Sequence, residues 1–314
     1  MDIEFIMLGS TADSLFWMFR YIERVENTLC MIESGFQLYL LSSSNLNNEW
    51  DAILRTNSIR HHFLKKNNSL DSLNIINFML KDPKNFNNIL ILIEKARENA
   101  RRSRVSITSE VWEAINTCWL YLNEELNKKI NENKIQTIIK NTREKIALIF
   151  GFLERSMLKN EILNFCYLGT FIERFDNTVR ILNTRYYLLL DEKKIRFEGY
   201  DNFQLEMILR SISSYRSYMW KNQNEIKANK VSYFLISDKD MPKSLMFCVN
   251  ETIKNLRSIH KKNFLKNKSY LNALSIQKKI KQKNRNFNNY SFLNSLFKLN
   301  MTLAANIEEE FNFQ

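Results

Sequence analysis

The stretch Y-I-E-R-V-E-N-T-L-C-M-I-E-S-G-F, residues 21–36, organises this chain, because a matching stretch, F-I-E-R-F-D-N-T-V-R-I-L-N-T-R-Y, occupies residues 171–186. The second stretch begins 150 residues after the first (171 − 21). Both contain Glu-Arg, then an acidic residue, then Asn-Thr. The matching polar residues are Glu23, Arg24, Glu26, Asn27 and Thr28, and Glu173, Arg174, Asp176, Asn177 and Thr178. A motif repeated at this distance predicts two versions of one structural unit.

The apolar spacing predicts that each copy is a helix. Apolar residues follow alternating steps of three and four, which place them on one helix face. They are Ile22, Val25, Leu29, Ile32 and Phe36 in the first copy, and Ile172, Phe175, Val179, Leu182 and Tyr186 in the second. Arg20, Glu23, Arg24 and Asn27 form a narrow polar stripe on the opposite side. Because the residues before and beside this stripe, F-W-M-F at 16–19, are apolar, the first helix has the composition of a buried central helix.

A buried Glu-Arg stripe needs partners, since burying an unpaired ion costs several kcal/mol. Two copies of one helix that cross about a pseudo-twofold axis would supply them reciprocally. We therefore expect Glu23 to pair with Arg174 and Glu173 with Arg24, and Asn27 and Asn177 to complete the hydrogen bonding. The alternative is an ordinary solvated face, which is the usual place of charged runs.

The rest of the chain favours an all-α, multi-helix bundle. Only 5 of the 314 residues are Gly and 2 are Pro, and strand-like alternation is scarce. Ile53-Leu54-Arg55 returns as Ile208-Leu209-Arg210, 155 residues later (208 − 53), and Phe78 and Asp82 return as Phe234 and Asp238, 156 residues later (234 − 78). The matches keep their order along the chain. They predict a single domain, residues 1–314, built from two pseudo-symmetric repeats at about 7–156 and 157–314.

Two local features add to this prediction. Gly169 stands just before the second Glu-Arg pair, where the lack of a side chain would let a neighbouring helix approach closely. Residues 231–236, V-S-Y-F-L-I, are rich in residues that favour strands, and we expect an extended connection there.

Composition excludes several classes of protein. No apolar run approaches 18 residues, and the first ten residues carry no basic segment, so neither a membrane span nor a secretory signal is predicted. The four cysteines are far apart and form no C-x-x-C pair, which is typical of buried thiols in a reducing compartment. We expect a cytoplasmic protein without a cofactor. The net charge of +12 accompanies many Lys, Asn and Ile residues, as an AT-rich coding bias would produce, so we discount it as evidence for a nucleic-acid partner and do not expect one.

One arginine-rich segment is a candidate binding surface for a ligand or partner. It contains Arg97, Arg101, Arg102 and Arg104. Arginines on a helix can clamp phosphates or carboxylates, or they can bond neighbours such as Glu94 and Glu98. The basic residues 261–285 offer a second cationic surface, for which a solvated helix pair or loop is the simpler interpretation.

A carboxylate-bridged metal site can be drawn from Glu23, Glu26, Glu173 and Asp176. Such sites in helical bundles combine their carboxylates with Glu-x-x-His motifs, which this chain lacks. Arg24 and Arg174 would also repel a cation. We therefore expect no metal, and no catalytic nucleophile or phosphate-binding loop is visible.

The motifs M-L-G-S-T-A-D-S-L-F-W-M-F-R-Y-I-E-R-V-E-N-T at 7–28 and L-G-T-F-I-E-R-F-D-N-T at 168–178 resemble those of the bacterial alpha-E domain family, a helical domain named for its Glu-Arg motif. The resemblance extends over nearly the whole chain. It departs at Lys243 and Thr170, where the family often has Arg, and at Leu163, where Trp is usual. The family begins close to Met7, so residues 1–6 are either an extension or a misassigned start.

The resemblance implies partners: a circularly permuted ATP-grasp protein and a transglutaminase-like peptidase, in systems thought to form amide bonds with ATP. It therefore predicts a non-catalytic helical accessory or scaffold protein, with the Glu-Arg residues as a structural motif. The alternative function is a helical module that binds nucleic acid or another polyanion without sequence specificity, through the arginine-rich segment and residues 261–285.

Overall fold

The computed structural model describes residues 8–41, 46–65, 67, 69–189, 198–282 and 290–313. These residues form helices joined by short connections, and no strand is found among them, which confirms the all-α prediction. The helices are α1 (Gly9–Leu40), α2 (Leu46–Thr56), α3 (Arg60–Leu64), α4 (Ser72–Leu80), α5 (Ile89–Arg102), α6 (Ser109–Asn127), α7 (Glu132–Ser156), α8 (Glu161–Leu189), α9 (Glu198–Ser211), α10 (Tyr215–Lys221), α11 (Ala228–Ile236), α12 (Leu245–His260), η1 (Lys261–Lys266), α13 (Lys268–Gln282) and α14 (Tyr290–Glu310).

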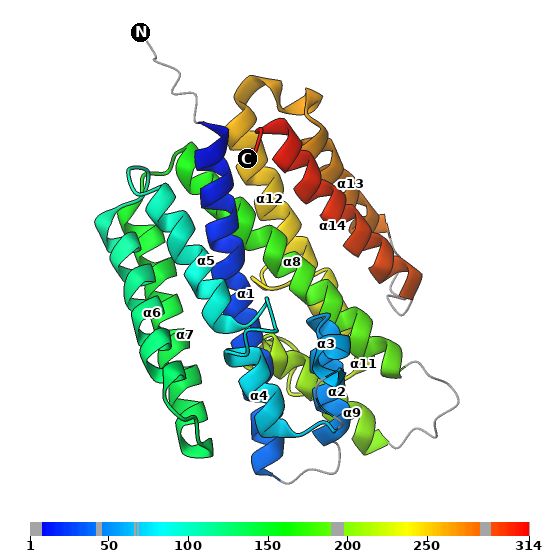
Figure 1. The fold of residues 1–314 in the computed structure, drawn as a ribbon. Coiled ribbons are helices and arrows are strands. Elements are labelled where there is room, and N and C mark those ends of the chain that lie inside the picture. Colours follow the sequence, from blue (N-terminus) through cyan, green and yellow to red (C-terminus); the bar gives the residue numbers. More distant parts are fainter. Residues whose placement is uncertain are drawn as a thin grey trace.

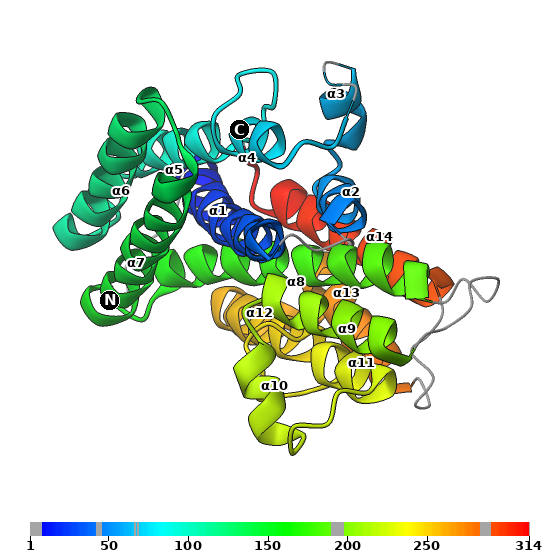
Figure 2. The same ribbon diagram turned by 90° about the horizontal axis from the view of Figure 1, so that it is seen from below.

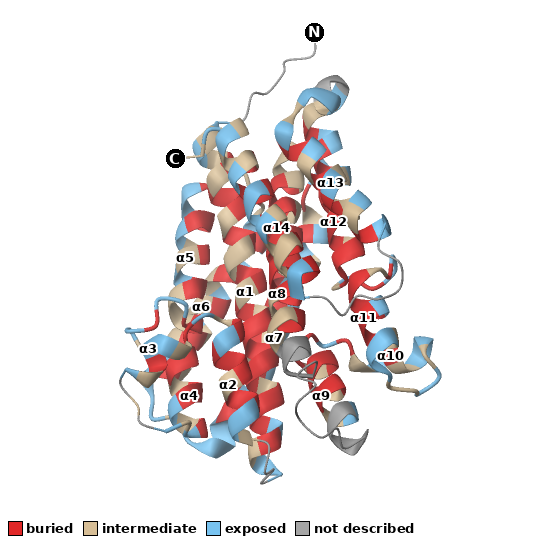
Figure 3. Ribbon diagram, turned by 90° about the vertical axis from the view of Figure 1, so that its right-hand side faces the viewer, coloured by how far each residue is buried: buried red, intermediate tan, exposed pale blue. Residues whose placement is uncertain are grey.

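The two longest helices, α1 and α8, lie against each other at the centre of the molecule (Figure 1). Buried positions occur all round α1, as its apolar flanks predicted, and Figure 3 shows the burial of the central helices. Gly169 of α8 lies against the α1 backbone, because a Cβ added there would stand 2.1 Å from the carbonyl oxygen of Phe16. The expected close approach is confirmed, and it brings the polar stripes of the two helices within hydrogen-bonding distance.

The helices of the two halves follow one another in a similar order, and one pair matches in both bounds. Helix α11 begins and ends 156 residues after α4 (228 − 72 and 236 − 80). In Figure 2, α4, α5 and α6 lie on one side of the α1–α8 pair, and α10, α11 and α12 lie on the other. The extended connection predicted for residues 231–236 is wrong, because helical spacing buries Val231, Phe234 and Leu235 together. Common descent of the two halves stays a prediction. The matching bounds of α4 and α11 are consistent with it.

Matching turns also join the corresponding helices. Ser58 and Ser213 both have positive φ values, 59° and 55°, and their amides donate to the carbonyls three residues earlier, at 2.9 Å each. Further along, Asn88 caps α5 and its side-chain amide donates to the Asp82 carbonyl. Ser244 caps α12 and donates to the Asp238 carbonyl in the same way. These turns present the residues just before the two caps, Asn87 and Lys243, to the central helices.

Each half completes its core with a helical hairpin, α6–α7 beside α5 and α13–α14 beside α12 (Figure 1). Helix α13 buries Tyr270, Ala273, Ile276 and Ile280. Lys268, Lys278 and Lys281 of the same helix are exposed. The described part of the basic tract is therefore an amphipathic helix with a solvated outer face; residues 283–289 lie outside the described part of the chain, as do residues 1–6.

Candidate functional site

The Glu-Arg residues of α1 and α8 form two reciprocal ion pairs. The Arg174 guanidinium donates to both Glu23 carboxylate oxygens, at 3.0 and 2.8 Å. The Arg24 guanidinium donates to both Glu173 oxygens, at 2.5 and 2.9 Å. Glu23 and Glu173 are only 1% and 3% exposed. Both predicted pairs are confirmed, and the solvated-face alternative is wrong.

A second cation reaches each buried carboxylate. Arg20 donates to Glu173 at 2.9 Å, whereas Lys243 places its ammonium 4.0 Å from Glu23. We call Glu23, Arg174 and Lys243 the Glu23 side, and Glu173, Arg24 and Arg20 the Glu173 side. Burial alone would raise the pKa of both carboxyls, but the surrounding cations outweigh burial. They hold the pKa of Glu23 below its ordinary value and lower that of Glu173 to about 2.

The acidic residue after each Glu-Arg pair has its own arginine. Glu26 accepts from Arg143 of α7 at 3.3 Å, and Asp176 accepts from Arg180 one turn along α8 at 2.6 Å. Burial and the nearby Glu173 raise the pKa of Asp176. The sequence analysis did not identify Arg143 and Arg180. The i to i+4 spacing of Asp176 and Arg180 was a usable signal, whereas Arg143 lies far along the chain from Glu26.

The first asparagine of the motif, Asn27, departs from the expected hydrogen bonding. Asn27 is 2% exposed and accepts from the Lys243 ammonium at 3.5 Å, not from the motif arginines. Its amide nitrogen, Nδ2, has no hydrogen-bond partner among the described residues. Because a lysine ammonium can only donate, this contact identifies which Asn27 atom is the oxygen and leaves Nδ2 as the unpaired donor.

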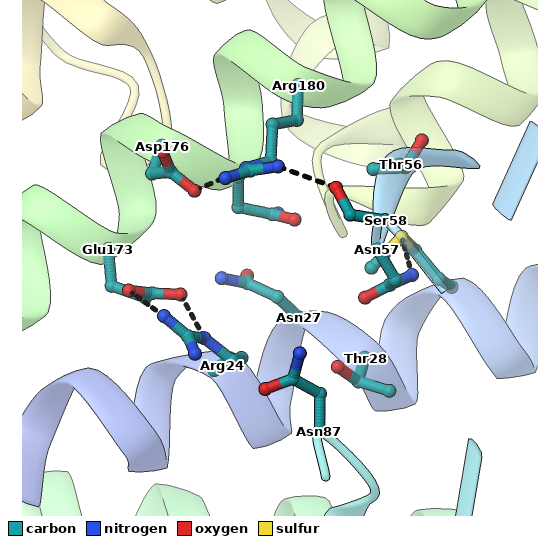
Figure 4. A pocket seen from close by; sticks show the side chains of 12 residues that line it. Arg24, Asn27, Thr28, Thr56, Asn57, Ser58, Asn87, Glu173, Asp176 and Arg180 are labelled. Carbon is teal, nitrogen blue, oxygen red and sulfur yellow. Dashed lines mark hydrogen bonds and ion pairs between the residues drawn. The ribbon is translucent and has the colours of Figure 1, made fainter. Parts of the chain in front are cut away.

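A polar cavity of about 140 Å³ lies on the Glu173 side (Figure 4). The residues around it come from α1, α8 and the two connections that follow α2 and α4. They are Arg24, Asn27, Thr28, Met31, Thr56, Asn57, Ser58, Asn87, Glu173, Asp176, Asn177 and Arg180. The Asn27 side chain points toward the open centre, with Glu173 on one wall and Asn87 on another. The sequence analysis did not identify this cavity.

A family model described as a predicted alpha-helical domain with a conserved ER motif matches residues 7–311. The chain belongs to the Alpha-E family. No significant match to a curated protein or to a solved structure was found. In this Alpha-E chain the ER residues, Glu23-Arg24 and Glu173-Arg174, join the two halves of the fold.

The four arginines of the candidate binding surface do not converge in this Alpha-E domain. Arg97 is half-buried, stacks 4.2 Å from the Trp119 ring centroid and donates to Asn116 at 2.7 Å. Arg104 lies 5.7 Å from the Trp112 ring centroid, and Arg101 and Arg102 are exposed. Arg97 therefore fastens α5 to α6, and only Arg101, Arg102 and Arg104 remain exposed for a ligand or partner.

The thiols of the Alpha-E domain are buried and unpaired. Burial raises the pKa of Cys30 to about 11 and the pKa values of Cys118 and Cys248 to about 12. Cys30 lines a second cavity, of about 450 Å³, with Glu33, Ser34, Gln37, Arg210, Ser213, Tyr215 and Arg216. No group of three His, Cys, Asp or Glu side chains suited to a metal ion occurs in the described residues. None of the helices in this part of the chain is both long and apolar enough to cross a membrane.

Proposed function

We propose that this chain is a non-catalytic accessory protein of an amide-forming system, in which it docks a circularly permuted ATP-grasp enzyme and works alongside a transglutaminase-like peptidase. Membership of the Alpha-E family supports the proposal, because resemblance to this family implies association with these two partners. The structural support is the central pair of helices. Their buried Glu23 and Glu173 carboxylates each form an ion pair with an arginine of the other helix, and these pairs hold the two halves together.

The pKa values of Glu173 and Cys30 favour a structural role for these buried groups over a catalytic one. A general acid or base works best with a pKa near the working pH. The cations around Glu173 lower its pKa to about 2, far from neutrality. A nucleophilic thiol needs a lowered pKa and access to solvent, whereas Cys30 is buried and has a pKa raised to about 11. These groups are suited to holding the fold together.

The test is reconstitution with the permuted ATP-grasp protein from the same genome. Size-exclusion chromatography with light scattering should show a stable complex of the two chains. ATP-dependent amide formation should require the complex, and the accessory chain alone should hydrolyse no ATP. Absence of a complex at about 10 μM of each chain, a concentration at which weak specific partners associate, would overturn the proposal.

Charge reversal locates the docking surface. Replacing Arg101 and Arg102 by Glu changes exposed residues at the end of α5, so the fold should persist while the complex weakens by about tenfold or more. The matched control replaces Lys278 and Lys281 of α13, also exposed, by Glu. Equal effects of the two variants would show that net charge, and not the α5 surface, governs association.

Polyanion binding is the second candidate function, and the exposed lysines of α13 favour it. Titration with heparin and with a short DNA duplex between 20 and 200 mM salt measures it, because phosphate contacts lose affinity steeply with salt. If α13 carries this function, the Lys278→Glu and Lys281→Glu double variant abolishes the salt-dependent binding. A flat titration at low salt removes this candidate.

A further inference from the structure

The two sides of the central crossing differ in what fills one corresponding position. Lys243 and Asn87 precede the matching caps of α12 and α5 and are 156 residues apart (243 − 87). On the Glu23 side, the Lys243 ammonium occupies the space beside Glu23 and Asn27. On the Glu173 side, the Asn87 side chain is two atoms shorter in length than that of a lysine and is exposed at the rim, and the corresponding space is the cavity of about 140 Å³.

The cavity wall contains an unpaired donor. Asn27 is 2% exposed, and its Nδ2 atom has no hydrogen-bond partner among the described residues. Leaving a buried amide donor unpaired costs about 1–3 kcal/mol. Figure 4 shows the Asn27 side chain directed into the cavity. An occupant with an oxygen acceptor at this point would remove that cost.

The opposite wall offers acceptors for a cation. Asp176 is 8% exposed and uses one carboxylate oxygen for Arg180, and Asn177 is buried beside it. Glu173 lies on the same wall, but both of its oxygens already accept from Arg24 and one also accepts from Arg20, so the second oxygen of Asp176 is the more available acceptor. Burial, and then the nearby Glu173, raise the pKa of Asp176, so a cation beside its carboxylate would favour the charged form. Arg24 and Arg180 also line the cavity, so its charged groups are mixed in sign.

Size limits the occupant to a small group. An engineered cavity of about 150 Å³ holds one benzene molecule, so a space of about 140 Å³ takes a group of roughly six heavy atoms. A bare ammonium would face Arg24 and Arg180 and leave the Asn27 donor unpaired, and a bare carboxylate would face Glu173 and Asp176. A group with an ammonium and an adjacent oxygen satisfies both walls.

We propose that this cavity binds an ammonium group with a carbonyl or carboxylate oxygen on the neighbouring carbon, which is the chemistry of a free amino acid and of a peptide amino terminus. The ammonium lies against Glu173, Asp176 and Asn177, in the place that Lys243 takes on the other side. The oxygen accepts from Asn27 Nδ2. This site goes beyond the proposed function, and its test uses the chain alone, so it stands or falls separately from the ATP-grasp partner.

Isothermal titration calorimetry of the full chain at pH 7 with L-alanine, L-alaninamide and trialanine tests the proposal. Saturable binding of alanine without trialanine identifies a free amino acid as the source, and binding of trialanine and alaninamide identifies a peptide terminus. N-acetyl-L-alaninamide and acetate should bind at least about tenfold more weakly, since each lacks the charged nitrogen. Equal binding of either control, or no saturable binding of any ammonium probe, overturns the proposal.

Asn87→Lys is the decisive variant, because it supplies the missing side chain from the exposed rim of the cavity. The new ammonium should fill the cavity as Lys243 fills its counterpart, and it should weaken the binding of the best probe by about tenfold or more. Asn87→Gln, which adds length without charge, is the matched control and should retain binding. Melting curves establish that both variants fold. Unchanged probe binding by a folded Asn87→Lys variant contradicts the assignment.

Discussion

The Glu23 side and the Glu173 side share a helical frame but differ in how the frame is filled. Each has a buried glutamate bonded to an arginine of the other central helix. The Glu23 side receives a lysine from the turn before α12, whereas the Glu173 side receives Arg20 from within α1 and leaves a cavity beside the turn before α5. The two matching motifs therefore form similar ion pairs, but Lys243 fills the space beside one pair and a cavity remains beside the other.

The largest expected effect comes from breaking the reciprocal pairs themselves. Arg24→Ala and Arg174→Ala each leave a buried carboxylate without its main partner, so each should lower the free energy of unfolding by about 3–5 kcal/mol. Urea denaturation followed by circular dichroism measures this. Arg210→Ala, which breaks a half-exposed pair with Glu206 within α9, is the control and should cost about 0.5 kcal/mol or less. A change that small for either motif arginine would show that its pair contributes little.

The pH dependence of stability should follow Glu23 and Glu173, whereas Asp176, whose pKa is raised, acts in the opposite direction. Because the folded-state pKa of Glu173 is lowered to about 2 from an ordinary 4.5, its contribution is fully present above pH 4.5 and is lost as the pH falls toward 2. Glu23 acts in the same direction. The loss from Glu173 should be on the order of 3 kcal/mol. Urea midpoints measured from pH 6 to 2.5 test this, and Glu173→Gln should show a flatter profile; parallel profiles would contradict the assignment.

Removing the residue that distinguishes the two sides should have a smaller effect. Lys243→Ala leaves the Asn27 oxygen without its donor and removes one cation from Glu23, which should cost about 1–3 kcal/mol. Asn87→Ala, at the exposed rim of the other side, should change stability by about 0.5 kcal/mol or less. Thermal melts of the two variants compare them. Equal losses of stability in the two variants would mean that Lys243 contributes no more to the Glu23 side than Asn87 does to the Glu173 side.

The smallest effect concerns the thiols. Cys30 occupies the position that corresponds to Arg180 (180 − 30 is 150), and it lines the second cavity. Burial raises its pKa to about 11, less than for Cys118 and Cys248, at about 12 each. In pulsed alkylation at pH 8 with peptide mapping, all four cysteines should react slowly, and Cys30 should react first because it lines a cavity. Earlier labelling of Cys118 would contradict this order.

The sequence predicted the helical class and the two ion pairs because both depend on local patterns. Three-four spacing determines which face of a helix is apolar, and a buried Glu-Arg stripe needs a reciprocal partner. The prediction for residues 231–236 was wrong because strand preference is weak beside tertiary burial. The match of Phe234 and Asp238 with Phe78 and Asp82 already pointed to a second α4-like helix there.

The cavity and the secondary arginines could not be predicted in the same way. They depend on side chains from separate helices and turns, such as Arg143 of α7 beside Glu26, and on the length of the side chain at position 87. The offset between Asn87 and Lys243 was visible in the sequence. Its meaning required the structure, which shows that both residues face the same two central helices from opposite halves.

The reciprocal pairing of α1 with α8 also determines the order in which the chain can fold during synthesis. A ribosome releases chains from the amino end at about 5–20 residues per second. Glu23 therefore spends several seconds outside the ribosome before Arg174 has been made. The nascent first half lacks the α8 partners of the buried residues of α1, so we expect its helices to stay loosely associated until α8 emerges.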